Sequence, residues 1–305
     1  MSSTELTIGF VAPGDRGAVH ALEDAGVASL WVGGHLASPN GSPEAMVWLA
    51  RLVEQTTRVR VGTATLLLPL YPPGIVAKQL ADLDRASGGR LVIGIGVGGE
   101  YPADFEAAGV PIAERGSRTS EAMEVLRAFW TGEPVTHQGK HFHYDDVRIF
   151  PPPTQPGGPP FIVTGRQPVA MRRAALLGDG WMPYLYSARR YGESVAQVRA
   201  FAEESGRDLA GFEWCAYVFV SLDDDPAKAR EGAGAFLGGV YRQDFDAMLD
   251  RVAVHGNVEQ VTEKVQAYVD AGARHVIFAP GGAGPEIAHR ILSEVVPGLV
   301  LPASV

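Results

Sequence analysis

Short apolar runs rich in β-branched residues alternate along the chain with longer stretches in which apolar residues recur every three or four positions. The first run, LTIGFVA at residues 6–12, is followed by an amphipathic stretch over residues 17–25 and then by Gly26. A period of two predicts a strand, a period near 3.6 predicts a helix, and glycine is typical of helix C-termini. This segment is therefore a predicted strand–helix unit.

The same alternation continues through the rest of the sequence. Further strands are predicted at residues 29–33, 59–68, 90–98, 161–164, 180–184, 213–220 and 275–279. Helices are predicted between them, among them residues 43–57, 73–86 and 117–130. Ser42 is expected to cap the first of these helices, with Pro43 in its first position. About eight near-continuous apolar strands with helical crossovers favour an α/β protein of the (β/α)8 TIM-barrel class over a doubly wound sheet.

One segment departs from this alternation. VTHQGKHFHYDDVRIF at residues 135–150 predicts a β-hairpin that turns at Gln138 and Gly139, and a stiff proline-rich connector follows it at residues 151–160. Neither stretch is typical of a domain linker. Because α/β barrels of this length commonly fold as one unit, residues 1–305 are expected to form a single domain.

Composition narrows the choice of partners. Hydrophobic residues make up 46% of the sequence and charged residues 20%, which suits a sizeable core. The formal net charge of −9 argues against a nucleic-acid partner, since binding a phosphate backbone requires a basic face. The single cysteine, Cys215, excludes an internal disulfide. The segment MSSTELTIGF lacks a signal-peptide pattern and prolines interrupt the apolar run after Ala64, so we expect a cytoplasmic protein without a membrane segment.

Gly94, Gly96 and Gly99 match G-x-G-x-x-G, a pattern of dinucleotide-binding Rossmann folds. That pattern normally lies on the first strand–helix turn, with an acidic residue about 20 positions later at the end of a second strand. Here it lies on the fourth predicted strand, after three strand–helix units, and the later region is the predicted helix over residues 117–130. In a barrel the glycines have another explanation: at a strand end they leave room for a flat ring, because they have no side chain.

Reacting groups of a (β/α)8 barrel gather at the C-terminal ends of its strands. The residues of this sequence expected at that rim are His35, Thr63, Gly98 to Glu100, Gly165 and Pro183.

Six segments along the chain form an ordered set of motifs. They are SLWVGGH, the Gly62-Thr63-Ala64 strand end, DRASGGRLVIGIGVGGEY, ERGSRTSEAMEVLRAFWTG, GKHFHYDDVRIFPPP and FIVTGRQPVAMRRAALLGDGW. In order and spacing they resemble the bacterial luciferase-like superfamily of flavin and deazaflavin oxidoreductases, over nearly the whole chain. The resemblance implies a barrel with rim insertions, one of them a helical stretch at about residues 225–255, and a bound coenzyme F420 or FMN at the C-terminal face.

The resemblance implies two catalytic residues. His35 matches the histidine that many F420-dependent members place beside the reactive ring carbon, although a lone loop histidine is usually only a surface residue. Imidazole suits this task because it exchanges a proton near neutral pH. Glu100 matches a glutamate that acts as a second acid or base in F420-dependent sugar dehydrogenases. The alternative for Glu100 is a solvated acid favoured by the dipole of the helix that follows.

The resemblance also implies the cofactor-binding residues. Thr63 and Ala64 match a non-prolyl cis peptide whose bulge backs the flavin ring, next to the open rim at Gly98 and Gly99. Gly165 and Arg166 match the phosphate site, where a helix start and a positive charge hold an anion. General barrel statistics favour a different phosphate site, the glycine-rich run at residues 281–284, whose other interpretation is a flexible connection.

The histidines His137, His141 and His143 form H-x3-H-x-H, but no acidic or cysteine ligand accompanies them at a familiar spacing, so no metal is expected.

The predicted function is hydride transfer between coenzyme F420 and a small organic substrate. The alternatives are an FMN-dependent monooxygenase, which uses FMNH2 and O2, and a flavin-binding protein without catalysis. The superfamily usually pairs through its early helices, so a homodimer is expected, and residues 43–55 carry more apolar side chains than one buried stripe needs.

Overall fold

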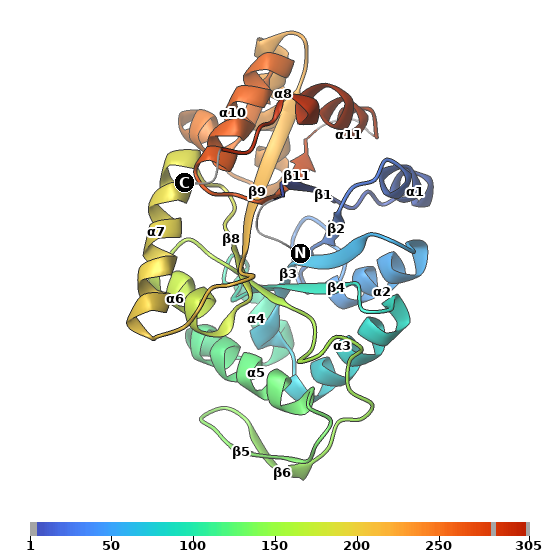
Figure 1. Ribbon diagram of the computed structural model, residues 1–305, viewed down its shortest axis with the longest axis vertical. Helices are drawn as coiled ribbons and strands as arrows, with labels where there is room; N and C mark the ends of the chain where they lie inside the picture. Colours follow the sequence, from blue (N-terminus) through green and yellow to red (C-terminus); the bar gives the residue numbers. More distant parts are fainter. Residues whose placement is uncertain (1–4, 282–284, 303–305) are drawn as a thin grey trace. The chain divides into compact units, whose positions relative to one another are not determined.

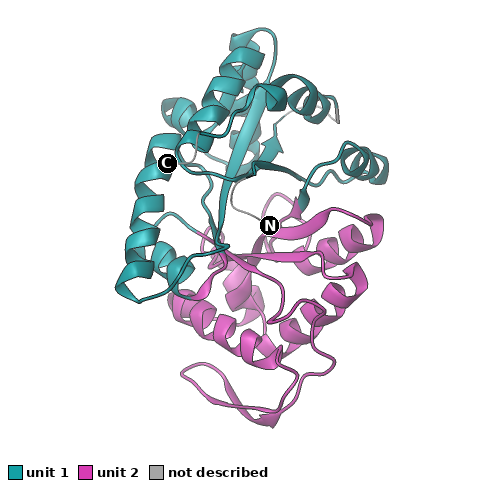
Figure 2. Ribbon diagram, viewed as in Figure 1, with its two compact units in different colours: residues 1–30, 165–176, 180–305 teal, residues 31–164, 177–179 magenta. Residues whose placement is uncertain are grey.

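The computed structural model describes residues 5–281 and 285–302. The chain forms two compact units, shown in Figure 2. Unit 1 comprises residues 1–30, 165–176 and 180–305, and unit 2 comprises residues 31–164 and 177–179. No helix within the described ranges is long and apolar enough to cross a membrane. The expectation of a single domain over residues 1–305 stays a prediction.

Unit 1 is built on parallel strands (Figure 1). β11 lies between β1 and β9, with His275 opposite Thr7 on one side and opposite Cys215 on the other. β8 and β10 also pair with β9 in parallel. The strands are β1 (Thr7–Val11), β8 (Gly180–Met182), β9 (Glu213–Leu222), β10 (Val254–Gly256) and β11 (His275–Pro280), with β2 (Ser29–Val32) starting in this unit and ending in unit 2.

Helices follow these strands along the chain. They are α1 (Arg16–Asp24), α6 (Pro168–Leu177), α7 (Ala188–Glu204), α8 (Pro226–Tyr241), α9 (Leu249–Val252), α10 (Val258–Asp270) and α11 (Pro285–Arg290). Three of the longer helices begin at a residue whose side chain caps them: Ser187 caps α7, Asp225 caps α8 and Asn257 caps α10. Gly26, with φ of +82°, follows α1 as predicted.

Unit 2 contains three parallel strands, with β4 (Leu91–Gly96) between β3 (Arg60–Leu67) and β7 (Phe161–Thr164). The strands are almost wholly buried, which explains their continuous apolar sequences. Its helices are α2 (Ala45–Gln55), α3 (Pro73–Ser87), α4 (Pro102–Ala108) and α5 (Arg115–Phe129). The hairpin of β5 (Val135–Gln138) and β6 (His143–Val147) extends beyond α5 (Figure 1).

Four local predictions were wrong in detail. Helix α2 begins at Ala45 with Glu44 as its cap, because the Glu44 carboxylate accepts the Val47 N–H at 2.8 Å. The hairpin turns over residues 139–142, since Gln138 still pairs with His143. Strand β4 ends at Gly96, because the positive φ angles of Gly98 and Gly99 are incompatible with a strand. The predicted helical stretch at residues 225–255 contains part of the three-residue strand β10, too short for a periodic signal.

Candidate active site

His35 lies in unit 2, three residues after strand β2. Its backbone N–H donates to the Pro43 carbonyl at 3.2 Å, so the loop folds back onto the chain just before α2. Gly34 is required at this contact, since a Cβ there would lie 2.1 Å from the Pro43 carbonyl oxygen. The imidazole is 24% exposed, which leaves it accessible to a small molecule.

Asp104 is the partner of His35. It lies in the first turn of α4, and its side chain is 1% exposed. The carboxylate contacts one loop at three points: Oδ2 is 2.8 Å from His35 Nδ1, and Oδ1 accepts the backbone N–H groups of Leu36 at 2.9 Å and Ala37 at 2.7 Å. Three donors on one buried carboxylate fix both the loop and the ring.

The contact defines the chemistry of the imidazole. When Nδ1 donates to the carboxylate, the lone pair of neutral His35 lies on Nε2. Among the residues that the structure describes, Nε2 has no hydrogen-bond partner. The ring of Tyr101 packs edge-on against the imidazole, with ring centroids 4.8 Å apart and planes at 78°. His35 is therefore held in place and can exchange a proton at Nε2.

The other end of the same loop is held by Glu44. The hydroxyl of Tyr71 donates to Glu44 Oε1, while Glu44 Oε2 caps α2. Burial, the hydrogen bond to Glu44 and the negative charges of Glu44 and Asp104 all raise the pKa of Tyr71. Tyr71 therefore stays a neutral donor, and the loop from His35 to Glu44 is bonded to the buried Asp104 at one end and to the half-buried Tyr71 at the other.

Sequence reasoning selected Glu100 and missed Asp104. Glu100 is exposed and precedes α4, whereas the hydrogen bond of His35 Nδ1 goes to Asp104. The available signal was weak: Asp104 follows Pro102 at a helix start, where an acid is common because of the helix dipole. Only the fold brings together two residues 69 positions apart.

The structure gives a reason for the glycines that follow strand β4, and the sequence did not show it. Gly98 and Gly99 have φ angles of +64° and +110°. A Cβ on Gly98 would lie 3.3 Å from the Phe105 ring, and one on Gly99 would lie 3.1 Å from Arg115 Nε. Backbone conformation and the chain's own side chains thus already favour glycine here, without a bound ring.

Strand β3 contains a bulge in its second half. Its register against β4 shifts between Thr63 and Leu66, and the non-prolyl cis peptide joins Ala64 to Thr65. The predicted bond, Thr63–Ala64, is therefore wrong by one position. Thr63 is fully buried and its hydroxyl donates to the Gly94 carbonyl at 2.9 Å, whereas Ala64 and Thr65 are half-buried. Two consecutive half-buried residues are what a bulge offers to a ligand.

Gly165 and Arg166 belong to unit 1, just before α6. Gly165 has φ of +132°, and its carbonyl accepts the Trp181 indole N–H at 3.0 Å. The Arg166 guanidinium lies over the Tyr184 ring at 5.2 Å. A fixed glycine turn, a positive charge and a helix start are the elements of an anion site.

The alternative phosphate site lies mostly outside the described residues, which exclude Gly282, Ala283 and Gly284. Gly281 is buried, and a Cβ there would lie 2.6 Å from the Phe236 ring. At Gly281 the glycine is therefore explained by packing against α8.

The hairpin histidines contact helix α5. His137 Nε2 lies 3.2 Å from Glu121 Oε1, and His141 Nε2 lies 2.8 Å from Ser117 Oγ. Burial opposes ionisation of Glu121, but the backbone N–H groups of Phe142 and His141, together with the side chains of His137 and His141, lower the Glu121 pKa. No group of three or more His, Cys, Asp or Glu residues that could hold a metal occurs in the described part of the chain. These contacts dock the hairpin on the helix.

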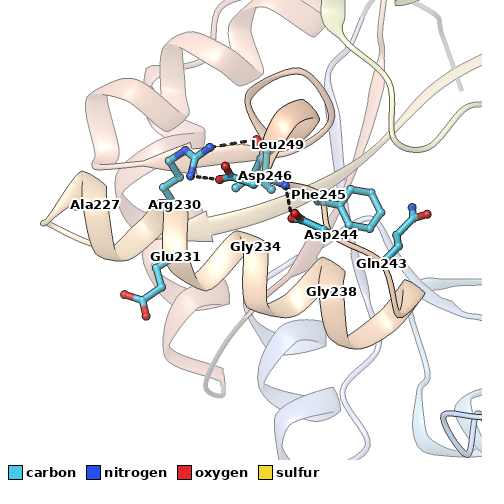
Figure 3. Close-up of a pocket in the computed structure, with 10 residues that line it drawn as sticks. All are labelled: Ala227, Arg230, Glu231, Gly234, Gly238, Gln243, Asp244, Phe245, Asp246 and Leu249. Atoms are coloured by element: carbon cyan, nitrogen blue, oxygen red, sulfur yellow. Dashed lines mark hydrogen bonds and ion pairs between the residues drawn. The ribbon is translucent and has the colours of Figure 1, made fainter.

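A pocket of about 580 Å³ lies in unit 1 between α8 and the segment that follows it (Figure 3). Arg230 Nη1 donates to Asp246 Oδ1 at 2.7 Å in this pocket, and the Asp246 backbone N–H donates to Asp244 Oδ1 at 2.8 Å. None of the predicted site residues lines this pocket. We therefore assign it no part in the function.

Comparison with known proteins supports the family that the sequence motifs resemble. The F420-dependent glucose-6-phosphate dehydrogenase of Gordonia bronchialis is 30% identical, over 91% of this chain and 92% of the relative. The 4-hydroxyprotoasukamycin monooxygenase of Streptomyces nodosus subsp. asukaensis is 31% identical, over 78% of this chain and 66% of the relative.

Among solved structures, an F420-dependent secondary alcohol dehydrogenase in complex with an F420-acetone adduct superposes with a TM-score of 0.85 at 21% identity. The superposition covers 97% of this chain and 99% of the alcohol dehydrogenase chain. This likeness confirms the predicted (β/α)8 TIM-barrel class. The model of the luciferase-like monooxygenase family matches residues 16–275. The chain therefore belongs to the luciferase-like monooxygenase family.

Proposed function

We propose that this protein is an oxidoreductase that transfers a hydride between coenzyme F420 and a small organic substrate, with His35 exchanging the accompanying proton. The observation that carries the proposal is the His35–Asp104 pair, in which a buried carboxylate holds Nδ1 of a partly exposed imidazole. The oxidoreductase class is common to the dehydrogenase and monooxygenase relatives. Three observations support F420 as the cofactor. They are the identity to the F420-dependent glucose-6-phosphate dehydrogenase, the structural likeness to the F420-dependent alcohol dehydrogenase, and the presence of His35.

The residues fit such a cofactor in each unit taken by itself. In unit 2 the half-buried Ala64 and Thr65 at the β3 bulge offer a backbone surface to a flat ring. In unit 1 the Arg166 side chain and the start of α6 offer charge and dipole to a phosphate. When bound, a deazaflavin supplies or accepts a hydride and leaves the proton to the protein. In this proposal four further residues contribute to cofactor binding through the backbone conformation at their positions: Thr63, Gly98, Gly99 and Gly165.

The chain's own part in the reaction is a proton transfer. When a hydroxyl-bearing substrate is oxidised, His35 Nε2 accepts the hydroxyl proton, and the imidazolium that forms lies against the Asp104 carboxylate. In the reverse direction the protonated ring returns that proton to the carbonyl oxygen. Glu100, which is exposed and directly precedes Tyr101 in the chain, is proposed as a second acid or base.

The second candidate function is an FMN-dependent monooxygenase, favoured by the 31% identity to 4-hydroxyprotoasukamycin monooxygenase. The test is mass spectrometry of the cofactor retained on purification, followed by titration with F420 and FMN. We expect F420 to bind at least about tenfold more tightly, a difference of about 1.4 kcal/mol. Retention of FMN together with product formation that requires O2 would establish the alternative.

Two further features belong to the proposal. We propose a homodimer formed through the early helices, because Val47 on α2 and Ile75 on α3 are 63% and 57% exposed. Light scattering at micromolar concentration is expected to give twice the chain mass of 32.4 kDa. We also propose a cytoplasmic location, where a reducing environment suits a sequence with a single, buried cysteine, Cys215.

A further inference from the structure

We propose that Asp104 is a positioning residue for His35: it keeps the proton of the neutral imidazole on Nδ1, so that Nε2 is the basic atom of the site. The inference rests on the proposed role of His35 as the proton-transfer residue. It concerns a side chain that does not itself reach the reacting atoms.

The roles of the two carboxylate oxygens can be assigned from their partners. Backbone N–H groups can only donate, so Oδ1, at 2.9 Å from Leu36 N and 2.7 Å from Ala37 N, must accept from both. Those two bonds fix the plane of the carboxylate relative to the loop. They leave Oδ2 facing His35 Nδ1 at 2.8 Å, where an ionised carboxylate also accepts.

Burial makes this preference strong. The Asp104 side chain is 1% exposed, so water does not compete for its oxygens. If the ring carried its proton on Nε2 instead, Nδ1 and Oδ2 would present two lone pairs to each other at hydrogen-bond distance. The tautomer with the proton on Nδ1 avoids this cost.

The ring cannot escape the cost by turning away. The His35 N–H donates to the Pro43 carbonyl, and the Tyr101 ring packs edge-on against the imidazole. Tyr101 is joined to the same short helix, since its carbonyl accepts the Asp104 N–H at 3.1 Å. The carboxylate and the aromatic ring that flank His35 are therefore both anchored at the start of α4.

A charge balance follows from the same geometry. Once Nε2 has taken a proton, the imidazolium lies 2.8 Å from a buried negative charge. The pair is then neutral as a whole, which stabilises the charged ring that the reaction forms. An asparagine in this place keeps the size of Asp104 but offers neither the charge nor a fixed acceptor.

The test uses the full chain with F420 bound and labels its histidine rings with ¹⁵N. The His35 signals are identified by their loss in His35→Gln, and the ring shifts report which nitrogen carries the proton. We expect the neutral ring of the wild type to be protonated on Nδ1. A wild-type ring protonated on Nε2 overturns the proposal without any variant.

The variants then connect the tautomer to the reaction. Asp104→Asn is expected to lose the preference for Nδ1 and to slow single-turnover hydride transfer roughly 10- to 100-fold, with the F420 dissociation constant changed less than about threefold. Asp104→Glu keeps a carboxylate and should restore part of the rate. Asp250→Asn, which removes an exposed carboxylate from His255, is the matched control and should leave the rate unchanged.

A double variant separates this proposal from the proposed function. If Asp104 acts through His35, His35→Ala with Asp104→Asn is no slower than His35→Ala alone. Multiplied rate losses in the double variant, or an unchanged tautomer in Asp104→Asn, overturn the positioning role. A His35→Ala variant with wild-type turnover instead contradicts the proposed function, while the tautomer measurement still decides the role of Asp104.

Discussion

Two histidine–carboxylate pairs in this protein have the same separation and opposite surroundings. His35 Nδ1 in unit 2 and His255 Nε2 in unit 1 each lie 2.8 Å from an aspartate oxygen. In the first pair the imidazole is 24% exposed and Asp104 is 1% exposed, whereas in the second the imidazole is 8% exposed and Asp250 is 67% exposed. Distance alone therefore does not distinguish a reactive pair from a structural one.

The difference lies in which partner is reachable. A buried carboxylate behind a reachable ring can tune a proton transfer, because solvent does not replace it. An exposed carboxylate in front of a buried ring contributes little, since water screens it. Burial, and after it the positive charge of Lys264, lower the pKa of His255. The Lys264 ammonium donates a hydrogen bond to the His255 backbone carbonyl at 2.9 Å. His255 is thus a neutral structural residue, and His35 is the candidate catalyst.

The largest expected effect separates the two histidines by activity. His35→Ala should lower turnover by roughly 10²-fold or more while leaving F420 affinity nearly intact, because the proposed ring and phosphate contacts lie elsewhere. His255→Ala is the matched control and should keep wild-type turnover. Steady-state kinetics with a fluorescence titration of F420 measures both; wild-type turnover in His35→Ala would leave Glu100 as the leading candidate.

The next effect separates the two aspartates by stability. Asp104→Ala leaves the Leu36 and Ala37 N–H groups without their acceptor, which is expected to cost about 2–4 kcal/mol. Asp250→Ala removes an exposed ion-pair partner and should cost no more than about 1 kcal/mol. Urea unfolding of both variants gives the comparison, and equal losses would contradict the distinction drawn from burial.

The smallest expected effect concerns pH. The pKa of His255 is lower in the folded state, so the unfolded chain binds the proton first as the pH falls. The stability associated with His255 is present above its ordinary pKa and is lost as the pH falls through the lowered one. Unfolding free energies of His255→Gln between pH 8 and pH 5 should therefore fall less steeply than those of the wild type. A steeper fall would reverse the assigned sign.

Much of the fold was predictable from the sequence because most strands outside the β5–β6 hairpin are buried on both faces, as in β2, β4 and β7, and the amphipathic helices are buried on one. The strand at Phe161–Thr164 was predicted to the residue, and β1, β2 and β11 within one or two residues. Strand β10 was missed, since three residues carry no period. The cap of α2 was misplaced because Glu44 has a longer side chain than the preferred caps and still reaches Val47 N–H.

The site was predictable only where a family motif marks it. His35 follows a recognisable strand, so its place at a strand end was expected. Asp104 carries no such mark, because its role depends on a contact across 69 positions. The cis peptide at Ala64–Thr65 was placed one bond early, since the bulge shifts the register between Thr63 and Leu66 and leaves no trace in the strand pattern.

Chemical rescue is the measurement that tests the central claim, proton transfer by His35, most directly. Free imidazole added to His35→Ala with F420 bound should raise turnover in proportion to its concentration, because it restores the missing base in the space that the side chain leaves. Imidazole should not change the turnover of the wild type or of His255→Ala. If His35→Ala is folded, binds F420 and shows the predicted loss of turnover, but imidazole leaves that turnover unchanged, the claim that His35 moves the proton is contradicted.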